Sequence, residues 1–273
     1  MLKKSLIGIF DSGFGGLEVF REIVKLLPEY DYIYLGDTAR APYGALAQAE
    51  IYKFTEQAVD FLLQKNCPLI ISACNTVSSE ALRKIQQNYL VKNCPEKRVL
   101  GVVIPAVESA VELTKNKKIG VIATQGTVAS ESFVKELNKI DSGIKVYQQA
   151  CPLLVPLIEA GKGNSMEMEL ALKQYLMPLM EKDIDTLILG CTHYGLLLDK
   201  IREITGKDIN IVSEGKIVAE KLKDYLKRHR EIQTKLSKNS TIEFLTTGLT
   251  EKFQKLGSVF FGSAIEVKKV DIR

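Results

Sequence analysis

Short apolar runs alternate with longer amphipathic stretches along the whole chain, and this alternation restricts the fold more than any other feature. The runs are almost continuously apolar, which is typical of strands that are buried on both faces. Between them, residues 17–27 and 51–63 place apolar side chains at helical spacing. This pattern predicts an α/β fold, with mainly parallel central sheets covered by helices. The predicted strands are residues 5–10, 31–36, 68–73, 99–104, 118–123, 144–148, 186–190, 209–212 and 241–246.

Two landmarks of the sequence recur at nearly the same spacing. IGIFDSG begins at Ile7 and IGVIATQG begins at Ile119, while Cys74 and Cys191 each end a buried run. Parallel strands resemble one another, so the first pair alone is weak evidence for a repeat. The cysteine pair is stronger, because each thiol occupies the same place relative to its strand. The recurrence therefore predicts two similar α/β halves.

Two polar segments indicate where the chain passes between these halves. Residues 88–98 (NYLVKNCPEKR) have the composition of a connector from the first half to the second. Residues 206–210 (GKDIN) are a candidate for the segment in which the chain returns to the first half. We therefore predict a discontinuous first domain, residues 1–97 plus 210–273, and a second domain inserted into it, residues 98–209.

Charge and hydropathy exclude several classes of partner. The 37 basic and 33 acidic residues leave a net charge of only +4, too small to indicate nucleic acid as the main partner. The basic stretch at residues 221–240 is predicted to be a solvated helix face and loop. No apolar stretch approaches the roughly 18 residues that a membrane span needs. Because the first apolar run ends early, at Asp11, we expect a first strand and not a signal peptide, and hence a cytoplasmic protein.

The five cysteines form no CxxC pair, and their number is odd. This argues against a disulfide framework and against a zinc site, so we expect reduced thiols and no bound metal. Cys67, Cys94 and Cys151 suit the ordinary role of a small buried hydrophobe. Cys74 and Cys191 differ, because polar residues follow each of them directly.

Polar residues after strand ends are candidates for ligand binding, because open parallel sheets bind ligands at the carboxyl ends of their strands. Residues 10–16 (FDSGFGG) place Asp11 at such an end, before a glycine turn that enters a helix and suits a small carboxylate or phosphate. The turn does not match GxGxxG, since position 18 is glutamate, and this argues against Asp37 as the ribose partner of a dinucleotide.

The loop at residues 36–48 contains a Pro-Tyr-Gly turn. Pro42, Tyr43 and Gly44 can present backbone amides and a hydroxyl group to a ligand, although an ordinary structural turn has the same composition.

The two strand-end cysteines carry the most specific chemistry. A helix that follows each thiol would stabilise its thiolate through free amides and the helix dipole. Asn75, Thr76 and Thr192 offer hydrogen bonds to a carboxylate or an amine, and His193 is a candidate acid/base partner of the second thiol.

Two equivalent thiols suit a reaction that is itself mirror-symmetric. In racemisation, one group removes a proton from one face of a carbon and another group returns a proton to the opposite face. Each group must lie within ~3–3.5 Å of the carbon, so the sulfurs should be about 7 Å apart across a cleft. Two pseudo-two-fold related halves, with the active site in the cleft between them, supply this geometry directly.

With these residues identified, the chain resembles the glutamate racemases of the cofactor-independent aspartate/glutamate racemase superfamily. The motifs that carry the resemblance occur in family order over most of the chain: FDSGFGGLEV (10–19), GDTARAPYG (36–44), ACNTVSS (73–79), VIATQGTVAS (121–130), VPLIEAG (155–161) and GCTHYG (190–195). The resemblance implies two α/β domains that close over L- or D-glutamate without pyridoxal phosphate or metal. It also implies a supply of D-glutamate for peptidoglycan, and we expect a homodimer.

The resemblance assigns roles to individual positions of this chain. It implies that Cys74 and Cys191 are the two acid/base residues, that Asp11 and His193 assist them, and that Glu159 is a further active-site carboxylate. The implied substrate-binding residues are Asp11, Ser12, Pro42, Tyr43, Gly44, Asn75, Thr76, Thr124, Thr192 and His193.

Four positions depart from the family pattern. Gly195, Val77 and Ile104 stand where proline, alanine and glutamate are common, and Glu214 lies near a position where aspartate is more usual. None of them is an implied catalytic group.

Several alternatives remain open from the sequence. Aspartate is a close alternative substrate, and related decarboxylases use a single cysteine. A non-catalytic amino-acid-binding module on the same scaffold would need no symmetric acid/base pair. A nucleotide-binding oxidoreductase rests only on the imperfect glycine turn.

Overall fold

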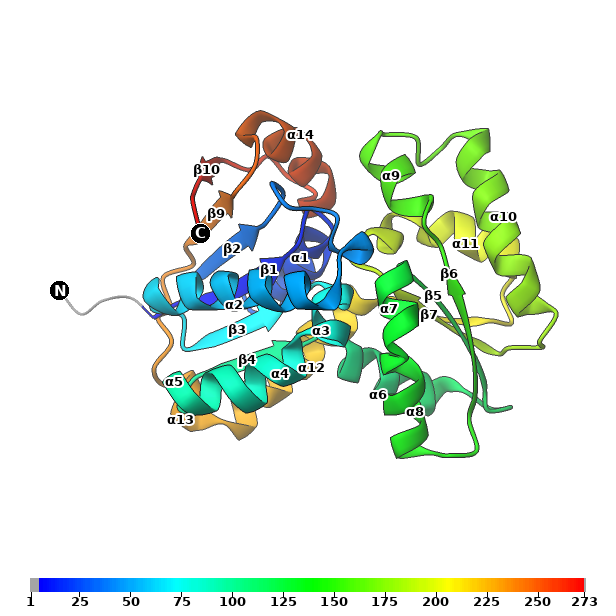
Figure 1. Cartoon of the computed structure of the whole chain (residues 1–273), viewed down its shortest axis with the longest axis horizontal. Coiled ribbons are helices and arrows are strands. Elements are labelled where there is room, and N and C mark those ends of the chain that lie inside the picture. Colours follow the sequence, from blue (N-terminus) through cyan, green and yellow to red (C-terminus); the bar gives the residue numbers. More distant parts are fainter. Residues whose placement is uncertain (1–4, 273) are drawn as a thin grey trace.

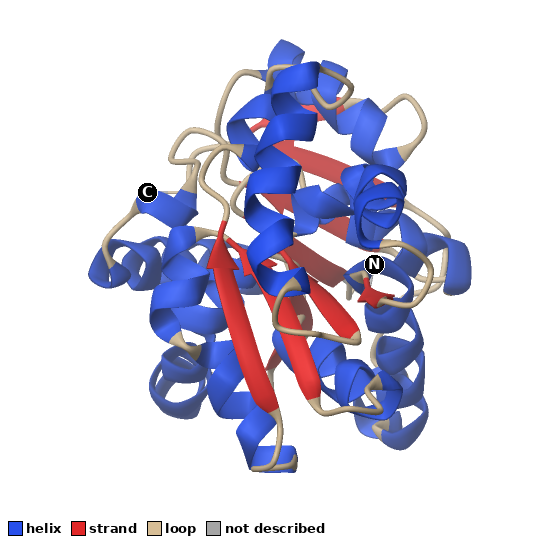
Figure 2. Ribbon diagram, turned by 90° about the vertical axis from the view of Figure 1, so that its right-hand side faces the viewer, coloured by secondary structure: helices blue, strands red, loops and turns tan. Residues whose placement is uncertain are grey.

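The computed structural model describes residues 5–272, which form two parallel β-sheets surrounded by helices (Figures 1 and 2). The predicted α/β class is confirmed, and every strand pair in the described residues is parallel. We call the six-stranded sheet with its helices the first lobe and the four-stranded sheet with its helices the second lobe. Figure 1 shows the first lobe on the left and the second on the right.

The six-stranded sheet has the order β10-β9-β2-β1-β3-β4. Its strands are β1 (Ile7–Asp11), β2 (Tyr32–Gly36), β3 (Leu69–Ser72), β4 (Arg98–Gly101), β9 (Ile242–Thr246) and β10 (Val267–Lys269). The four-stranded sheet has the order β6-β5-β7-β8. Its strands are β5 (Lys118–Ala123), β6 (Lys145–Ala150), β7 (Thr186–Gly190) and β8 (Asn210–Val212).

The two sheets share one arrangement. The segment β2-β1-β3-β4 of the first sheet has the same order as β6-β5-β7-β8 of the second. Strand β1, which begins at Ile7, therefore corresponds to β5, and β3, which precedes Cys74, corresponds to β7, which precedes Cys191. These are the landmarks that recur in the sequence. Strands β9 and β10 have no counterpart in the second sheet.

Helices cover both sheets, and Figure 2 shows the strands enclosed between them. The α-helices are α1 (Gly16–Leu26), α2 (Gln48–Gln64), α3 (Asn75–Glu80), α4 (Leu82–Lys84), α5 (Val91–Asn93), α6 (Val103–Leu113), α7 (Gln125–Ser130), α8 (Ser132–Ile140), α9 (Leu154–Glu159), α10 (Met166–Met180), α11 (Leu198–Thr205), α12 (Glu214–Arg228), α13 (Arg230–Gln233) and α14 (Thr250–Phe261). Shorter helical segments are the 3-10 helices η1 (Tyr43–Ala45) and η3 (Thr192–Leu197) and the π-helical η2 (Ile85–Leu90). None of the helices within residues 5–272 is long and apolar enough to cross a bilayer.

Helix α1 illustrates why the sequence folds in this way. Leu17, Phe20 and Ile23 recur at helical spacing and are fully buried, which places one face of α1 against the sheet. The same apolar cluster continues into the second lobe through Tyr194 and Leu197 of η3. The lobes therefore share a packed core in addition to polar contacts.

The prediction that residues 99–104 form a single strand was wrong. Strand β4 ends at Gly101, and α6 begins at Val103 with Pro105 in its first turn. Proline is tolerated there because the first-turn amide has no partner within the helix. An apolar run that covers a strand end and a helix start cannot be divided by hydropathy alone.

The predicted domain boundaries pass close to two short strands. Strand β4 pairs with β3 in the first sheet, and β8 pairs with β7 in the second. The division into residues 1–97 plus 210–273 and residues 98–209 remains a proposal, and we now place its two crossings after β4 and after β8.

Candidate active site

The carboxyl ends of β1, β3, β5 and β7 direct polar residues from both lobes into one small cavity. Its volume is about 30 Å³. It is lined by Ser12, Gly13, Ala41, Pro42, Tyr43, Gly44, Cys74, Asn75, Thr76, Thr124, Val155, Glu159, Cys191, Thr192 and His193. Every residue that we selected as a candidate from the sequence lines this cavity except Asp11, which is buried directly behind Gly13.

Cys74 lies at the N-cap of α3, after the end of β3. Its Sγ lies 3.3 Å from Oγ of Ser12. Burial and the nearby charge of Asp11 raise the pKa of the Cys74 thiol to about 11, while hydrogen bonds from Ser12 and from the backbone of Val77 act in the opposite direction. The helix terminus therefore contacts the thiol as predicted, but desolvation has the larger effect on its pKa, so the thiol is protonated.

Cys191 lies at the N-cap of η3, after the end of β7. The segment that follows is thus a 3-10 helix and not the α-helix that the sequence suggested; α11 begins only at Leu198. Burial raises the pKa of Cys191 well above its ordinary value, opposed by a hydrogen bond from the backbone of His193. This second thiol is therefore also protonated.

A chain of polar groups leads from Cys191 toward solvent. Nδ1 of His193 lies 3.8 Å from Sγ of Cys191, and Nε2 of His193 lies 3.3 Å from Oε1 of Glu159. Nζ of Lys252, which is more than half exposed, lies 3.7 Å from the other oxygen of Glu159. Burial opposes ionisation of Glu159, but His193 and Lys252 outweigh it and lower the pKa of this carboxyl. Glu159 is therefore ionised and holds the imidazole beside the thiol.

Asp11 is the buried carboxyl on the Cys74 side. One of its oxygens, Oδ2, accepts a hydrogen bond of 2.8 Å from the backbone of Gly13, while Oδ1 has no partner among residues 5–272. Burial raises the pKa of Asp11, and the charge of His193 partly offsets this effect. A carboxyl with a raised pKa and a free oxygen can exchange a proton with a neighbouring group.

Glycines allow the two lobes to approach each other at the cavity. A Cβ atom at Gly15 would lie 2.3 Å from Oγ1 of Thr192 and 2.5 Å from Nδ1 of His193. A Cβ atom at Gly44 would lie 2.8 Å from Cβ of Thr124. We expected the glycine turn at residues 10–16 to admit a bound anion; at Gly15 it instead admits side chains of the opposite lobe.

The remaining cavity residues are held by hydrogen bonds to neighbours. Thr76 and Thr124 face each other across the lobes, with 3.1 Å between their hydroxyl oxygens. The hydroxyl of Tyr43 donates to the buried carboxylate of Asp37. Asp37 thus anchors the Pro-Tyr-Gly turn. This contact gives Asp37 a structural role, in agreement with the sequence argument against Asp37 as the ribose partner of a dinucleotide.

Sequence reasoning missed three residues at or near this site. Val155 and Ala41 complete the cavity wall, and Glu214 forms a hydrogen bond with Asn75 from behind it. Val155 lies within the VPLIEAG motif, which was a usable signal, whereas Glu214 is distant in sequence and appeared only as a departure from the family pattern. The sulfur separation of about 7 Å stays a prediction. Within the described part of the chain, no group of three or more His, Cys, Asp or Glu side chains could hold a metal ion.

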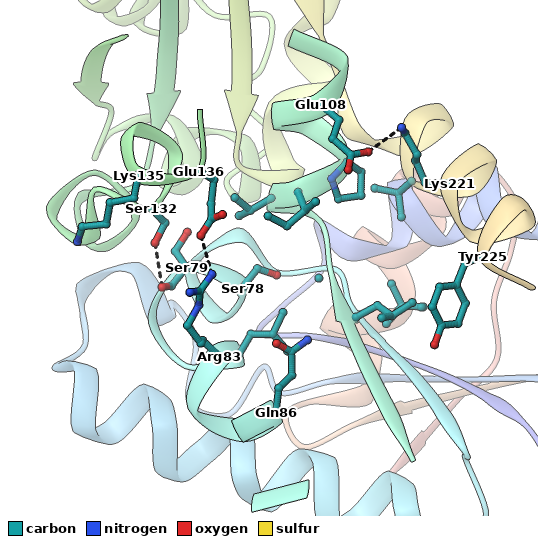
Figure 3. A pocket seen from close by; sticks show the side chains of 18 of the residues that line it. Ser78, Ser79, Arg83, Gln86, Glu108, Ser132, Lys135, Glu136, Lys221 and Tyr225 are labelled. Carbon is teal, nitrogen blue, oxygen red and sulfur yellow. Dashed lines mark hydrogen bonds and ion pairs between the residues drawn. The ribbon is translucent and has the colours of Figure 1, made fainter. Parts of the chain in front are cut away.

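A larger cavity, of about 720 Å³, lies at the other end of α3 and contains neither candidate thiol (Figure 3). Three polar contacts cross between the lobes around it: Arg83 to Glu136 at 2.7 Å, Lys221 to Glu108 at 2.7 Å, and Ser132 Oγ to the backbone carbonyl of Ser79 at 3.0 Å. Asn75 and Thr76 line the small cavity and residues 78–79 line the large one, so α3 separates the two.

Comparison with known proteins places this arrangement among racemases. The family model described as Asp/Glu/Hydantoin racemase matches residues 7–222. The chain is 41% identical to "Glutamate racemase 2" of Caldanaerobacter subterraneus subsp. tengcongensis and 42% identical to a glutamate racemase of Thermoanaerobacter sp., in each case over 97% of both proteins.

Solved structures agree with this result. A glutamate racemase isoform from Bacillus anthracis superposes with a TM-score of 0.88 at 36% identity over 98% of both chains. The glutamate racemase of Francisella tularensis subsp. tularensis, solved in complex with D-glutamate, gives a TM-score of 0.89 at 33% identity over 99% of both chains.

Proposed function

The chain belongs to the Asp/Glu/Hydantoin racemase family, and on that premise we propose that it interconverts L- and D-glutamate by proton transfer between Cys74 and Cys191. The observation that carries the proposal is the equivalent placement of the two thiols. Each follows the same strand of a repeated four-strand arrangement, and both line one cavity at the junction of the lobes. Relatives of about 40% identity that are named glutamate racemases support the choice of substrate.

The proposed reaction needs one thiolate and one thiol. The thiolate of one cysteine removes the Cα proton, and the electron pair of the broken C–H bond delocalises into the α-carboxylate. The thiol of the other cysteine then donates its proton to the opposite face of Cα and becomes the thiolate. One cysteine has gained a proton and the other has lost one, so the resting state returns after exchange with nearby acid/base groups. The same steps run in reverse from the other enantiomer.

Burial keeps both thiols protonated, so substrate binding has to favour the thiolate. The α-ammonium group of glutamate would bring a positive charge close to the two thiols, and a nearby positive charge lowers a thiol pKa. We assign to Asp11, whose charge acts on the Cys74 thiol, the role of taking the proton from Cys74. We assign the same role for Cys191 to the imidazole of His193, which ionised Glu159 holds.

Glutamate is larger than the cavity, so the walls must separate to admit it, and the residues that line them can then satisfy its remaining groups. We assign the hydroxyls of Ser12, Thr76, Thr124 and Thr192, the Asn75 side chain and the Pro42–Tyr43–Gly44 turn to the amine and the two carboxylates. We further propose that the chemistry needs no bound cofactor, that D-glutamate supplies peptidoglycan synthesis in the cytoplasm, and that the enzyme acts as a homodimer.

The first test is incubation of the purified protein with L-glutamate in D2O without added cofactor, followed by chiral separation and mass analysis. We expect D-glutamate that carries one deuterium at Cα. Aspartate serves as the competing substrate, and higher turnover of aspartate would overturn the assignment to glutamate.

Single cysteine variants test the two-base mechanism. We expect C74A and C191A each to abolish interconversion, because each lacks one of the two proton-transfer groups. Exchange of the Cα proton with solvent should survive from at most one enantiomer in each variant. Normal racemisation by both variants would contradict the mechanism.

A further inference from the structure

Glu214 is a buried carboxyl that the proposed reaction does not use. It is the first residue of α12, and only 3% of its surface is exposed. Its Oε2 accepts a hydrogen bond of 2.8 Å from Nδ2 of Asn75, a residue that lines the active-site cavity. Glu214 thus reaches the cavity only through the Asn75 amide.

The surroundings of Glu214 favour a neutral acid. The charged groups that face it are themselves acidic: Glu18 from α1 and Asp11 from β1. The carboxyl group of Glu18 lies close to the residue that follows Glu214, since a Cβ atom at Gly215 would lie 2.8 Å from it. A Cβ atom at Gly195 would lie 3.2 Å from the same group. Burial together with these charges raises the pKa of Glu214 well above its ordinary value. A buried carboxyl group without a neighbouring cation lowers the stability of the folded chain, so we expect a function for Glu214 at the active-site cavity.

The hydrogen bond fixes which end of the Asn75 amide is available. Nδ2 is committed to Glu214, whereas Oδ1 of Asn75 is buried and has no hydrogen-bond partner among residues 5–272. An amide oxygen only accepts hydrogen bonds, so it suits an ammonium group and not a carboxylate. A rotation of the amide by half a turn would present N–H groups to the substrate instead.

We propose that Glu214 is a positioning residue that holds the Asn75 amide so that its oxygen accepts a hydrogen bond from the α-ammonium group of glutamate. This inference rests on the proposed function, because it takes glutamate as the ligand. Glu214 acts as a neutral hydrogen-bond acceptor and not through charge. Its removal therefore affects ligands that carry an amine and leaves the other groups of the ligand in place.

Two variants and two ligands separate this role from a structural one. E214M keeps the approximate size of the side chain but removes the acceptor, and E214Q keeps an oxygen that can accept the same bond. D-glutamate carries the amine, and glutarate has the same two carboxylates without it. Binding of each ligand is measured by calorimetry, alongside kcat, KM and thermal unfolding.

For E214M we expect the affinity for D-glutamate to fall on the order of tenfold, the effect of losing one hydrogen bond to a charged group. Glutarate affinity should change less than about twofold, and KM should rise with kcat nearly unchanged, since the lost contact serves binding. The unfolding temperature should change little, because the substitution removes a buried polar group together with one buried hydrogen bond. E214Q should match the wild type in all of these measurements.

A double-mutant cycle with N75A tests the route through Asn75. Once Asn75 is alanine, E214M should cause no further loss of D-glutamate affinity, because residues that act through one contact are not additive.

Four results would overturn the proposal: equal weakening of glutarate and D-glutamate, unchanged D-glutamate affinity in E214M, a loss in E214Q as large as in E214M, or additive effects with N75A. If the wild-type protein bound glutarate but not glutamate, the proposed function would fail instead, so the two failures are distinguishable.

Discussion

Replacing Gly15 with alanine should damage catalysis by displacing one wall of the active site. The added Cβ atom would lie 2.3 Å from Oγ1 of Thr192 and 2.5 Å from Nδ1 of His193. Ordinary van der Waals contacts begin near 3.4 Å, so the segment that carries these two residues must retreat by about 1 Å. The displaced imidazole is the group that contacts Cys191, at 3.8 Å.

A misplacement of about 1 Å at a reacting group lowers rates by about a hundredfold. We therefore expect kcat/KM of G15A to fall by about that factor in both directions. The loss should arise mainly in the proton transfers that we propose for Cys191, because the Cys74 side contacts Ser12 and not His193.

The assay follows conversion of each enantiomer by chiral chromatography and, separately, the exchange of each Cα proton in D2O. G15A should retain exchange from the enantiomer that Cys74 deprotonates better than exchange from the other. The matched control is G163A, whose Cβ atom would lie 4.0 Å from its nearest neighbour, Leu197, and should be harmless. The reasoning is refuted if G15A racemises glutamate within twofold of the wild-type rate.

Two further predictions concern stability. Asp31 is fully buried; although burial opposes ionisation, hydrogen bonds from Thr241 and Asn239 hold its pKa well below the ordinary value. D31N should therefore lose about 1–3 kcal/mol at pH 7, and its deficit should shrink below about pH 4, because there the unfolded wild-type chain binds a proton at Asp31 while the folded chain still holds the carboxylate; urea unfolding at several pH values tests this, and a deficit that does not depend on pH would contradict it. The Arg83–Glu136 ion pair crosses between the lobes at 2.7 Å, but the Arg83 side chain is 62% exposed (Figure 3). R83M should change the free energy of unfolding by less than about 0.5 kcal/mol, and a loss above about 1 kcal/mol would show that this pair holds the lobes together.

The sequence predicted those parts of the fold that depend on local pattern. The buried runs that end before Cys74 and Cys191 are strands β3 and β7, because continuous apolar runs suit strands covered on both faces. The helix predicted over residues 17–27 is α1, offset by one residue at each end. The repeated landmarks are matched by the repeated order of four strands.

Features that depend on contacts between distant segments could not be predicted in this way. Glu214 has the ordinary appearance of an acidic residue at the start of a helix, and only the packing of α12 against α1 buries it next to Asn75. The short strand β10 carries no apolar run, since two of its three residues are lysines, and it forms by pairing with β9. The role of Gly15 likewise depends on Thr192, which approaches from the other lobe.

The additional strands β9 and β10, together with α14, extend only one of the two matching sheets, and α14 brings Lys252 to Glu159. The surroundings of Cys74 and Cys191 are therefore unequal, although the two free enantiomers of a substrate have equal free energies. For such a reaction kcat/KM depends on the height of the shared barrier above free enzyme and free substrate, and this height is the same in both directions. The asymmetry can thus make kcat differ between the two enantiomers only if KM differs between them by the same factor. An enzyme with this asymmetry can have a lower KM for one enantiomer of its substrate, but its kcat for that enantiomer must then be lower as well.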